Sequence, residues 1–196
     1  MGMETINTVE QDRADMERLA SGHDAALNAL MERHAGPVYQ FLYRMLSDEE
    51  DANDFAQETF ARVYRYRERY DGGKFTTWLY TIASNLARSE YRRRGRHPNV
   101  SLDAQIGNEG NTVGDMLPSS GAAPSEEAEK VEREQAVRQA VDGLPADLRE
   151  AVVLCEWEEM SVADAADVLN TTEKAVESRL YRARQKLREE LSKWLL

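Results

Sequence analysis

Residues 161–191 read SVADAADVLNTTEKAVESRLYRARQKLREEL, and this stretch predicts two short helices joined by a tight turn. Ser161, and Thr171 or Thr172, are residues that cap helix N-termini, and Asn170 tolerates the left-handed backbone of a tight turn. Apolar residues recur at the spacing of one helical face: Val162, Ala165, Ala166 and Leu169 in the first helix, and Val176, Leu180, Ala183 and Leu187 in the second. The stretch therefore predicts a helix-turn-helix.

Polar and cationic side chains cover the outward faces of the second of these helices. Lys174, Ser178, Tyr181 and Gln185 face away from the apolar arc, with Arg179, Arg182 and Lys186 on one flank and Arg184 and Arg188 on the other. A recognition helix in the major groove of DNA places its N-terminal side chains at base edges and its flanking cations at phosphates. The pattern favours double-stranded DNA as a ligand.

Earlier in the chain, residues 62–96 read RVYRYRERYDGGKFTTWLYTIASNLARSEYRRRGR. The Asp-Gly-Gly sequence at residues 71–73 predicts a turn, because glycine adopts positive φ without strain. Thr76 or Thr77 is expected to cap the helix that follows. That helix has an apolar arc of Trp78, Leu79, Ile82, Ala83 and Leu86, and a polar stripe, expected to point away from the core, of Thr81, Asn85, Arg88 and Arg92.

Aromatic residues are interleaved with the arginines of this stretch: Tyr64, Tyr66, Tyr70, Phe75 and Tyr80. Cations that neutralise phosphate, beside aromatic faces on which unpaired bases stack at ~1–3 kcal/mol per base, are the two components of single-strand binding. The alternative is structural, since some of these rings must belong to a core and arginine-rich helix ends are often only solvated. The stretch favours nucleic acid as a ligand and leaves the structural interpretation open.

Further helices are expected at the N-terminal side of this stretch. Two helical segments, separated by a break near Gly36 and Pro37, are marked by Ala26, Leu27, Leu30 and Met31 and then by Val38, Phe41, Leu42 and Met45. Another helix is expected after Ser47, with Glu50 completing a capping box. Its apolar arc lies opposite an acidic ridge formed by Asp51, Asp54 and Glu58. Such a ridge is either a solvated back face or a docking surface for a basic partner.

Residues 101–125, SLDAQIGNEGNTVGDMLPSSGAAPS, are rich in glycine, serine, asparagine and proline. A segment of this composition cannot bury enough apolar surface to order itself, so we interpret it as a linker. No run of alternating apolar residues bounded by turns predicts a strand on either side. The expected fold is all-α, with two small helical domains joined by a flexible acidic linker and the helix-turn-helix in the C-terminal domain.

Charge is distributed unevenly along the 196 residues, whose formal net charge is −11. Residues 1–60 carry a net charge of −9 and residues 101–160 carry −10, whereas residues 61–100 carry +7 from ten basic and three acidic side chains. A basic segment within an acidic protein indicates a local phosphate-binding surface. The acidic remainder should suppress indiscriminate binding to DNA.

The same composition excludes several classes of protein. One cysteine, Cys155, allows neither an internal disulfide nor a cysteine-based metal cluster, and its apolar neighbours predict burial. The three histidines are isolated, and there is no Gly-rich phosphate loop or nucleophile–base motif, so we expect no catalytic residue, metal or cofactor. The longest apolar run, residues 151–155, is too short to cross a bilayer, and the acidic N-terminus is unlike a signal peptide. No membrane insertion and a cytoplasmic location are therefore expected.

Four motifs follow one another in the chain. They are DAxDxxQETF at residues 51–60, FxxWLxxIAxN at residues 75–85 with three arginines at 92–94, LPxxxR at residues 144–149, and SRLxRAR at residues 178–184. In this order, across a linker, they resemble the extracytoplasmic-function (ECF) sigma factors, small bacterial relatives of sigma-70 that have only regions 2 and 4. The resemblance extends from about residue 25 to residue 191.

This resemblance implies a role for each part of the chain. Residues 1–24 would be an N-terminal extension, 25–98 a region 2-like domain, 99–128 the linker and 129–196 a region 4-like domain. The first domain would bind the β′ clamp helices of core RNA polymerase and open the −10 promoter element, holding an unpaired base. The second would read the −35 element as duplex and contact the β flap. The linker would run toward the active-centre cleft and RNA exit path, and an anti-sigma factor would be a further partner.

The residues that match the family's motifs form three candidate sites. The core polymerase site consists of Asp51, Asp54, Gln57 and Glu58. The site for single-stranded −10 DNA consists of Lys74, Phe75, Trp78, Asn85, Arg88, Arg92 and Arg93, of which Trp78 is also a candidate core residue. The site for −35 duplex consists of Thr172, Lys174, Glu177, Ser178, Arg179 and Arg182.

Three positions depart from the family's usual pattern: Ser89 stands where an acidic residue is common, Ala175 where threonine is common and Glu177 where a basic residue is common. The Glu177 carboxylate can accept from cytosine N4 but is repelled by phosphate, so the −35 sequence is not predictable. Two other interpretations are a helix-turn-helix repressor or activator that acts without polymerase, and a helical adaptor. The acidic ridge argues against the first, and the arginine stripes argue against the second.

Overall fold

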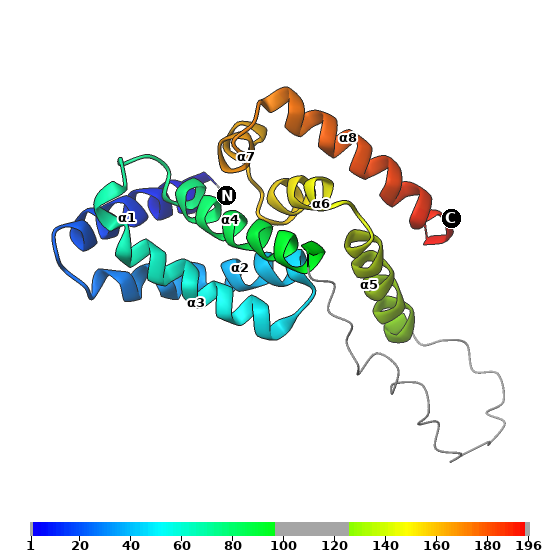
Figure 1. Cartoon of the computed structure of the whole chain (residues 1–196), viewed down its shortest axis with the longest axis horizontal. Helices are drawn as coiled ribbons and strands as arrows, with labels where there is room; N and C mark the ends of the chain where they lie inside the picture. The colour runs from blue at the N-terminus through cyan, green and yellow to red at the C-terminus, as the bar shows by residue number, and fades with distance from the viewer. Residues whose placement is uncertain (1, 97–125, 195–196) are drawn as a thin grey trace, which may run out of the picture.

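The computed structural model describes residues 2–96 and 126–194 (Figure 1). The first range contains α1 (Gly2–Ala20), α2 (Ala26–Leu46), α3 (Glu49–Arg65), a short 3₁₀ turn η1 (Arg67–Arg69) and α4 (Phe75–Arg96). The second contains α5 (Glu126–Asp142), α6 (Ala146–Val152), a π-helical turn η3 (Val153–Trp157), α7 (Val162–Leu169), α8 (Glu173–Glu190) and a 3₁₀ turn η4 (Ser192–Trp194). All regular elements in these two ranges are helical, which confirms the expected all-α class.

Helix α2 is the centre of the N-terminal bundle and packs against α1, α3 and α4 (Figure 1). Its residues Leu30, Val38 and Phe41 are fully buried. The predicted break near Gly36 and Pro37 is wrong, because α2 is continuous and has Pro37 inside it. Apolar residues before and after the proline are buried in the same core, and this packing outweighs the roughly 3 kcal/mol that proline costs within a helix.

Two helix starts also differ from the prediction. The N-cap of α3 is Asp48, whose Oδ1 accepts a backbone N–H at 2.8 Å, whereas Ser47 has a left-handed φ of 55° and ends α2. Only Ser47 and Asp48 separate the two helices, so Ser47 is the C-cap of α2 and Asp48 is the N-cap of α3. Helix α4 begins at Phe75, and Thr76 and Thr77 lie inside its first turn instead of capping it. Burial of Phe75, which is 2% exposed, extends the helix back to that residue.

The helix-turn-helix is formed by α7 and α8 as predicted. Ser161 caps α7, its Oγ accepting from the Asp164 N–H at 3.0 Å, and Thr172 caps α8. Asn170 between them has the left-handed φ of 48° that its residue type allows. The predicted apolar faces of both helices are buried or half-buried. Cys155, which was expected to be buried, is half-buried because the turn that carries it ends at the surface.

The N-terminal and C-terminal parts pack against each other. Helix α4 lies along α7, and α2 contacts α5, α6 and η3. The buried apolar residues of both parts form one continuous cluster. In the described ranges, no helix is long and apolar enough to cross a membrane.

The expected linker and N-terminal extension are described only in part. Residues 99–125 of the linker lie outside the described residues, and its last three, 126–128, belong to α5. Within the extension 1–24, residues 2–20 form α1, which packs on α2.

Candidate nucleic-acid interface

The acidic ridge lies on α3, opposite the buried apolar arc of that helix. Asp54 and Gln57 are exposed, and Glu58 is paired with Arg62, whose Nε lies 2.7 Å from Glu58 Oε1. Asp51 differs from the others because its carboxylate binds the guanidinium of Arg94 at the end of α4. Asp54 and Gln57 thus form the exposed part of the ridge, whereas Asp51 also joins α3 to α4.

The loop that precedes α4 is a compact turn. Gly72 has a φ of 84°, the conformation expected of glycine here. Asp71 Oδ1 accepts from the Gly73 N–H at 3.0 Å, and the Tyr70 hydroxyl donates to the Gly73 carbonyl. These bonds give the loop a defined shape next to Lys74.

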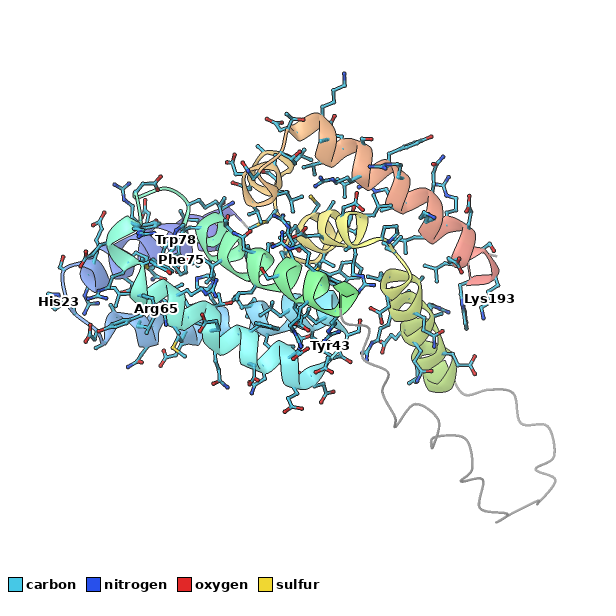
Figure 2. The ribbon with its side chains drawn as sticks, in the orientation of Figure 1. His23, Tyr43, Arg65, Phe75, Trp78 and Lys193 are labelled. Carbon is cyan, nitrogen blue, oxygen red and sulfur yellow. The ribbon has the colours of Figure 1, made fainter. Side chains whose placement is uncertain are left out.

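Three aromatic side chains pack together next to this turn. The ring centroids of Tyr70, Phe75 and Trp78 lie 5.6 to 6.4 Å apart, and Figure 2 shows Phe75 and Trp78 side by side at the start of α4. Phe75 is buried, whereas Trp78 is half-buried. Trp78 is therefore the more accessible of these two rings, and Phe75 lies inside the cluster.

The middle and end of α4 carry the remaining candidate −10 residues. Asn85 is exposed, and Arg92, also exposed, donates to Ser89 Oγ at 3.3 Å. Arg93 donates two hydrogen bonds, at 2.6 and 2.7 Å, to the buried carboxylate of Glu90. These bonds lower the pKa of Glu90 although burial opposes the charge. The Arg93 guanidinium is thus held in a fixed orientation, while its side chain remains 59% exposed.

Two candidate −10 residues are paired with the C-terminal part of the chain. Arg88 Nε donates to both carboxylate oxygens of Glu150 at 3.0 Å, and Lys74 Nζ donates to Asp164 Oδ2 at 2.8 Å. Burial raises the pKa of Glu150, and Arg88 partly offsets that effect. The predicted outward orientation of the polar stripe is correct for Asn85 and wrong for Arg88, because Arg88 turns to the buried carboxylate of Glu150 on α6.

The candidate −35 residues lie around the N-terminal half of α8. Lys174, Glu177, Ser178 and Arg182 are exposed, as is the cap residue Thr172. Arg179 is only 24% exposed at its side chain and points toward α6, where its Nε lies 3.9 Å from Asp147 Oδ2. Together with Arg88 and Arg92 it lines a pocket of about 400 Å³. The structure therefore brings one −35 candidate next to two −10 candidates.

Arg149 is a residue whose importance sequence reasoning missed. Its side chain is buried and donates to the Met45 carbonyl at 2.9 Å, to the Tyr91 hydroxyl at 2.6 Å and to the Asp142 carbonyl. It thereby joins α2, α4 and α5. The only signal in the sequence was its place in the LPxxxR motif beside a long apolar run.

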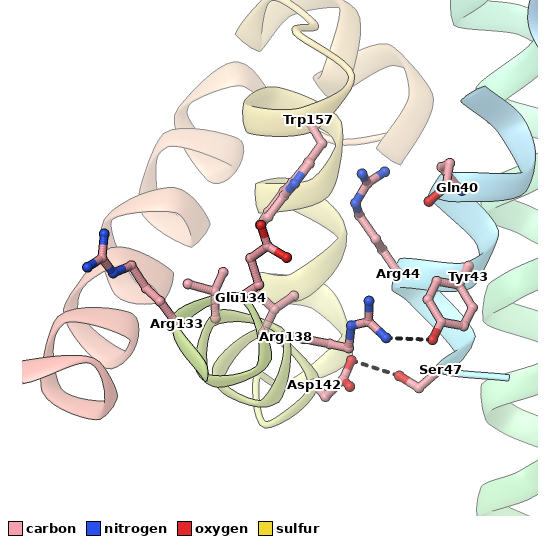
Figure 3. A pocket seen from close by; sticks show the side chains of 11 residues that line it. Gln40, Tyr43, Arg44, Ser47, Arg133, Glu134, Arg138, Asp142 and Trp157 are labelled. Carbon is pink, nitrogen blue, oxygen red and sulfur yellow. Dashed lines mark hydrogen bonds between the residues drawn. The ribbon is translucent and has the colours of Figure 1, made fainter. Parts of the chain in front are cut away.

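A larger pocket of about 740 Å³ lies where α2 faces α5, and Figure 3 shows its lining. Arg138 donates to the Tyr43 hydroxyl at 2.9 Å, and the Ser47 hydroxyl donates to Asp142 Oδ1 at 2.7 Å. Polar contacts between the two parts thus cross this pocket. Nowhere in residues 2–96 and 126–194 do three histidine, cysteine or carboxylate side chains converge to hold a metal ion.

Comparison with known proteins matches both parts of the chain. Residues 30–97 match the family model described as Sigma-70 region 2, and residues 134–187 match the one described as Sigma-70, region 4. The chain is 32% identical over 178 residues to the ECF RNA polymerase sigma factor SigW of Bacillus subtilis, covering 90% of this chain and 94% of that protein. This chain belongs to the ECF sigma-factor family.

A further relative and two solved structures agree. The chain is 34% identical to the RNA polymerase sigma-H factor of Pseudomonas aeruginosa, covering 91% of this chain and 92% of the relative. This chain is also similar to CnrH, whose structure is solved in complex with the cytosolic domain of CnrY. The two sequences are 27% identical, the TM-score is 0.67, and the match covers 93% of this chain and 97% of that chain. The sigma factor RpoE of Bartonella quintana, at 24% identity, 84% and 96% coverage and a TM-score of 0.61, supports the fold.

As an ECF sigma factor, the chain is a transcription initiation factor and not an enzyme. It binds core RNA polymerase and recognises promoter DNA. The sigma-factor interpretation of the sequence is therefore confirmed over the repressor and adaptor interpretations. The region 2 match of this sigma factor begins at residue 30, within α2, so α1 precedes both matched regions.

Proposed function

We propose that residues 25–98 form the unit that docks on core polymerase and opens the −10 element, and that residues 129–196 form the unit that reads the −35 duplex. The observation that carries this proposal is the separate exposure of two polar surfaces on helices of different parts. On α4 the exposed residues are Asn85 and Arg92, and on α8 they are Lys174, Ser178 and Arg182. The first surface lies on the same helix as a half-buried aromatic ring, and the second lies on the recognition helix of a helix-turn-helix.

The residues of α4 have the chemistry that an unpaired base requires. Taking a base out of the stack costs a few kcal/mol, which a protein offsets by stacking and by hydrogen bonds to the base edge. Trp78 supplies a ring, Asn85 supplies an amide that both donates and accepts, and Arg92 and Arg93 supply charges for phosphate. Phe75 is 2% exposed, so we assign it the role of shaping this site from within the aromatic cluster.

The ion pairs between the two parts limit when the whole −10 site can act. Lys74 and Arg88 are bound to Asp164 and Glu150, which lie on α7 and α6. A carboxylate and a phosphate compete for the same guanidinium or ammonium group. Full engagement of the −10 strand by these two residues therefore requires α6 and α7 to move away from α4.

The partners of the protein follow from the same surfaces. We assign Asp54, Gln57 and Glu58 of α3 to the β′ clamp helices, with the β flap as a further contact of residues 129–196. We further propose that the protein is cytoplasmic, because it acts with RNA polymerase. We also propose an anti-sigma factor as a regulatory partner. This is supported by the solved structure of the similar protein CnrH, which is in complex with the cytosolic domain of CnrY.

Transcription from a promoter library tests this proposal. The purified full chain is mixed with core polymerase and a library randomised at the −35 and −10 positions, and the templates that form open complexes are sequenced. Enrichment of paired −35 and −10 sequences, dependent on the added chain, supports the assignment. Tight binding to duplex DNA without any core-dependent open complex would contradict it and favour action without polymerase.

Replacing Asn85 by alanine is expected to reduce open-complex formation about tenfold, the effect of losing about 1.4 kcal/mol at a base contact. Asn28→Ala removes the same group from an exposed position on α2 and serves as the matched control. Permanganate footprinting of unpaired thymines on a selected promoter measures the effect. Equal opening by both variants would remove Asn85 from the −10 site.

Replacing Arg179 by alanine is expected to weaken binding to the −35 duplex. A base contact predicts a loss of ~1–3 kcal/mol that depends on sequence, whereas a phosphate contact predicts a salt slope smaller by about one. Fluorescence anisotropy of holoenzyme on a labelled −35 duplex, at several salt concentrations, distinguishes these cases. Arg133→Ala, at an exposed position of α5 outside every candidate site, is the control, and an effect no larger than that of the control would exclude Arg179 from the site.

A further inference from the structure

Four ionisable side chains, none of them in a candidate site named above, interact between α1 and α2. Arg33 Nε donates to Asp12 Oδ1 at 2.9 Å, and its Nη2 donates to Asp15 Oδ2 at 2.6 Å. Asp12 Oδ2 accepts from His34 Nε2 at 2.8 Å. Asp12 is 2% exposed, Asp15 9% and His34 8%. This cluster, the α1–α2 charge cluster, attaches α1 to the bundle.

Attaching a helix through buried charged groups costs free energy of desolvation. Carboxylates lose their hydration on burial, and a well-packed apolar pair often gives equal or greater stability. Charged hydrogen bonds fix direction as well as distance, because the planar guanidinium accepts only certain positions of its partners. Arg33 donates to the carboxylates of Asp12 and Asp15, and Asp12 accepts from both the Arg33 guanidinium and the His34 ring. The α1–α2 charge cluster therefore sets the orientation of the His34 ring.

The His34 ring packs against the residue that follows the loop of the −10 site. Its centroid lies 5.2 Å from that of Phe75, at an interplanar angle of 58°. Phe75 is the first residue of α4 and packs against both Tyr70 and Trp78. A chain of contacts thus runs from Asp12 through His34 and Phe75 to the half-buried Trp78.

Helix α1 also contacts the other side of this loop. It packs on η1 and on α4, next to Tyr70, as Figure 1 shows for α1 and α4. Burial raises the pKa of the Tyr70 hydroxyl, and Arg13 and Asp12 of α1 are close enough to act on it electrostatically. The Tyr70 hydroxyl in turn donates to the Gly73 carbonyl in the turn. Both ends of the loop, residues 70 and 75, are therefore supported from α1.

We propose that α1 is a positioning element for the −10 loop and that Asp12 and His34 are its positioning residues. Asp12 orients His34, His34 sets the ring of Phe75, and Phe75 sets the turn and Trp78 that face the unpaired strand. Neither Asp12 nor His34 touches DNA. The inference rests on the proposed function, since it requires that this loop and α4 bind the −10 strand.

The test uses full-length chain assembled with core polymerase. Two labelled single strands are the probes: the non-template −10 strand of a promoter selected from the library, and the same strand with the −10 bases scrambled. The ratio of the two affinities measures selectivity. Asp12→Asn keeps the size of the side chain and removes its charge, and Glu10→Gln makes the same change at an exposed position of α1.

We expect Asp12→Asn to lower the selectivity ratio about tenfold, with unchanged affinity for core polymerase and for −35 duplex. Glu10→Gln should leave all three quantities unchanged. In a background with Trp157 and Trp194 replaced by phenylalanine, the emission of Trp78 should shift in Asp12→Asn and not in Glu10→Gln. A role in stability alone would lower the thermal midpoint without changing selectivity or emission below the transition.

Each outcome decides the proposal. If Asp12→Asn does not fold, Arg33→Gln replaces it, because the Arg33 side chain is 26% exposed and its loss leaves the Asp12–His34 contact in place but unsupported. Selectivity equal to that of Glu10→Gln, while Asn85→Ala loses selectivity, overturns the role of α1 and leaves the proposed function intact. Equal selectivity in wild type, Asn85→Ala and Asp12→Asn overturns the −10 assignment and with it this inference.

Discussion

Replacing Arg149 by alanine is expected to lower the free energy of unfolding by about 3 kcal/mol. Hydrogen bonds to a charged group contribute about 1.5–3 kcal/mol, and their loss leaves buried acceptors unsatisfied. Arg149 donates to the Met45 carbonyl, the Tyr91 hydroxyl and the Asp142 carbonyl; the Tyr91 hydroxyl also donates to the Met45 carbonyl, so the last two acceptors are the ones that lose a partner outright. Urea unfolding followed by far-ultraviolet circular dichroism measures the loss.

Arg138→Ala is the matched control for this prediction. Arg138 also bridges α5 and α2, through the Tyr43 hydroxyl, but its contact is exposed and should contribute no more than about 1 kcal/mol. Because Arg149 joins α2, α4 and α5, its loss should also separate the two parts, which small-angle scattering detects as a larger radius of gyration. Equal losses in Arg149→Ala and Arg138→Ala would show that Arg149 does not hold the parts together.

Reversing charge at Asp54 and Glu58 to lysine is expected to weaken binding to core polymerase about a hundredfold. Like charges opposed across a complementary interface cost several kcal/mol, and a hundredfold change corresponds to about 2.7 kcal/mol. The fold should persist, because Asp54 is exposed and Glu58 has only a surface ion pair with Arg62. Competition with a labelled chain for core polymerase measures the affinity.

The control reverses two exposed carboxylates elsewhere, Glu10 and Glu32, and changes the net charge by the same amount. It separates a local docking effect from the effect of overall charge on association. Equal affinity of the Asp54→Lys/Glu58→Lys variant and the wild type would remove the acidic ridge from the polymerase interface. A loss of the same size in the control would assign the effect to net charge alone.

Local signals predicted much of the fold because the interactions behind them span only a few residues. A cap joins a side chain to an N–H three residues away, as at Ser161 and Thr172, and a turn depends on the φ of one residue, as at Gly72 and Asn170. These features were predicted correctly. The cap of α3 was wrong by one residue, at Ser47 instead of Asp48, because both residue types cap helices and the left-handed end of α2 decided between them.

Long-range contacts accounted for the wrong predictions. The continuity of α2 through Pro37 depends on burial against α3 and α4, which outweighs local propensity. The start of α4 at Phe75 depends on rings from other segments, including that of His34. Helical periodicity identifies which side of a helix is apolar, but not which neighbour covers its polar side.

The sequence by itself determined that this protein is helical, that it contains a helix-turn-helix, and which family its motifs match, because each depends on residues close together in the chain. Only the tertiary structure decided that Arg88 pairs with Glu150, 62 residues away, that Asp12 binds His34, and that Arg149 joins three helices. A buried charge takes the partner that packing brings to it, since desolvation makes an unpaired charge costly. That choice of partner is a property of the assembled core.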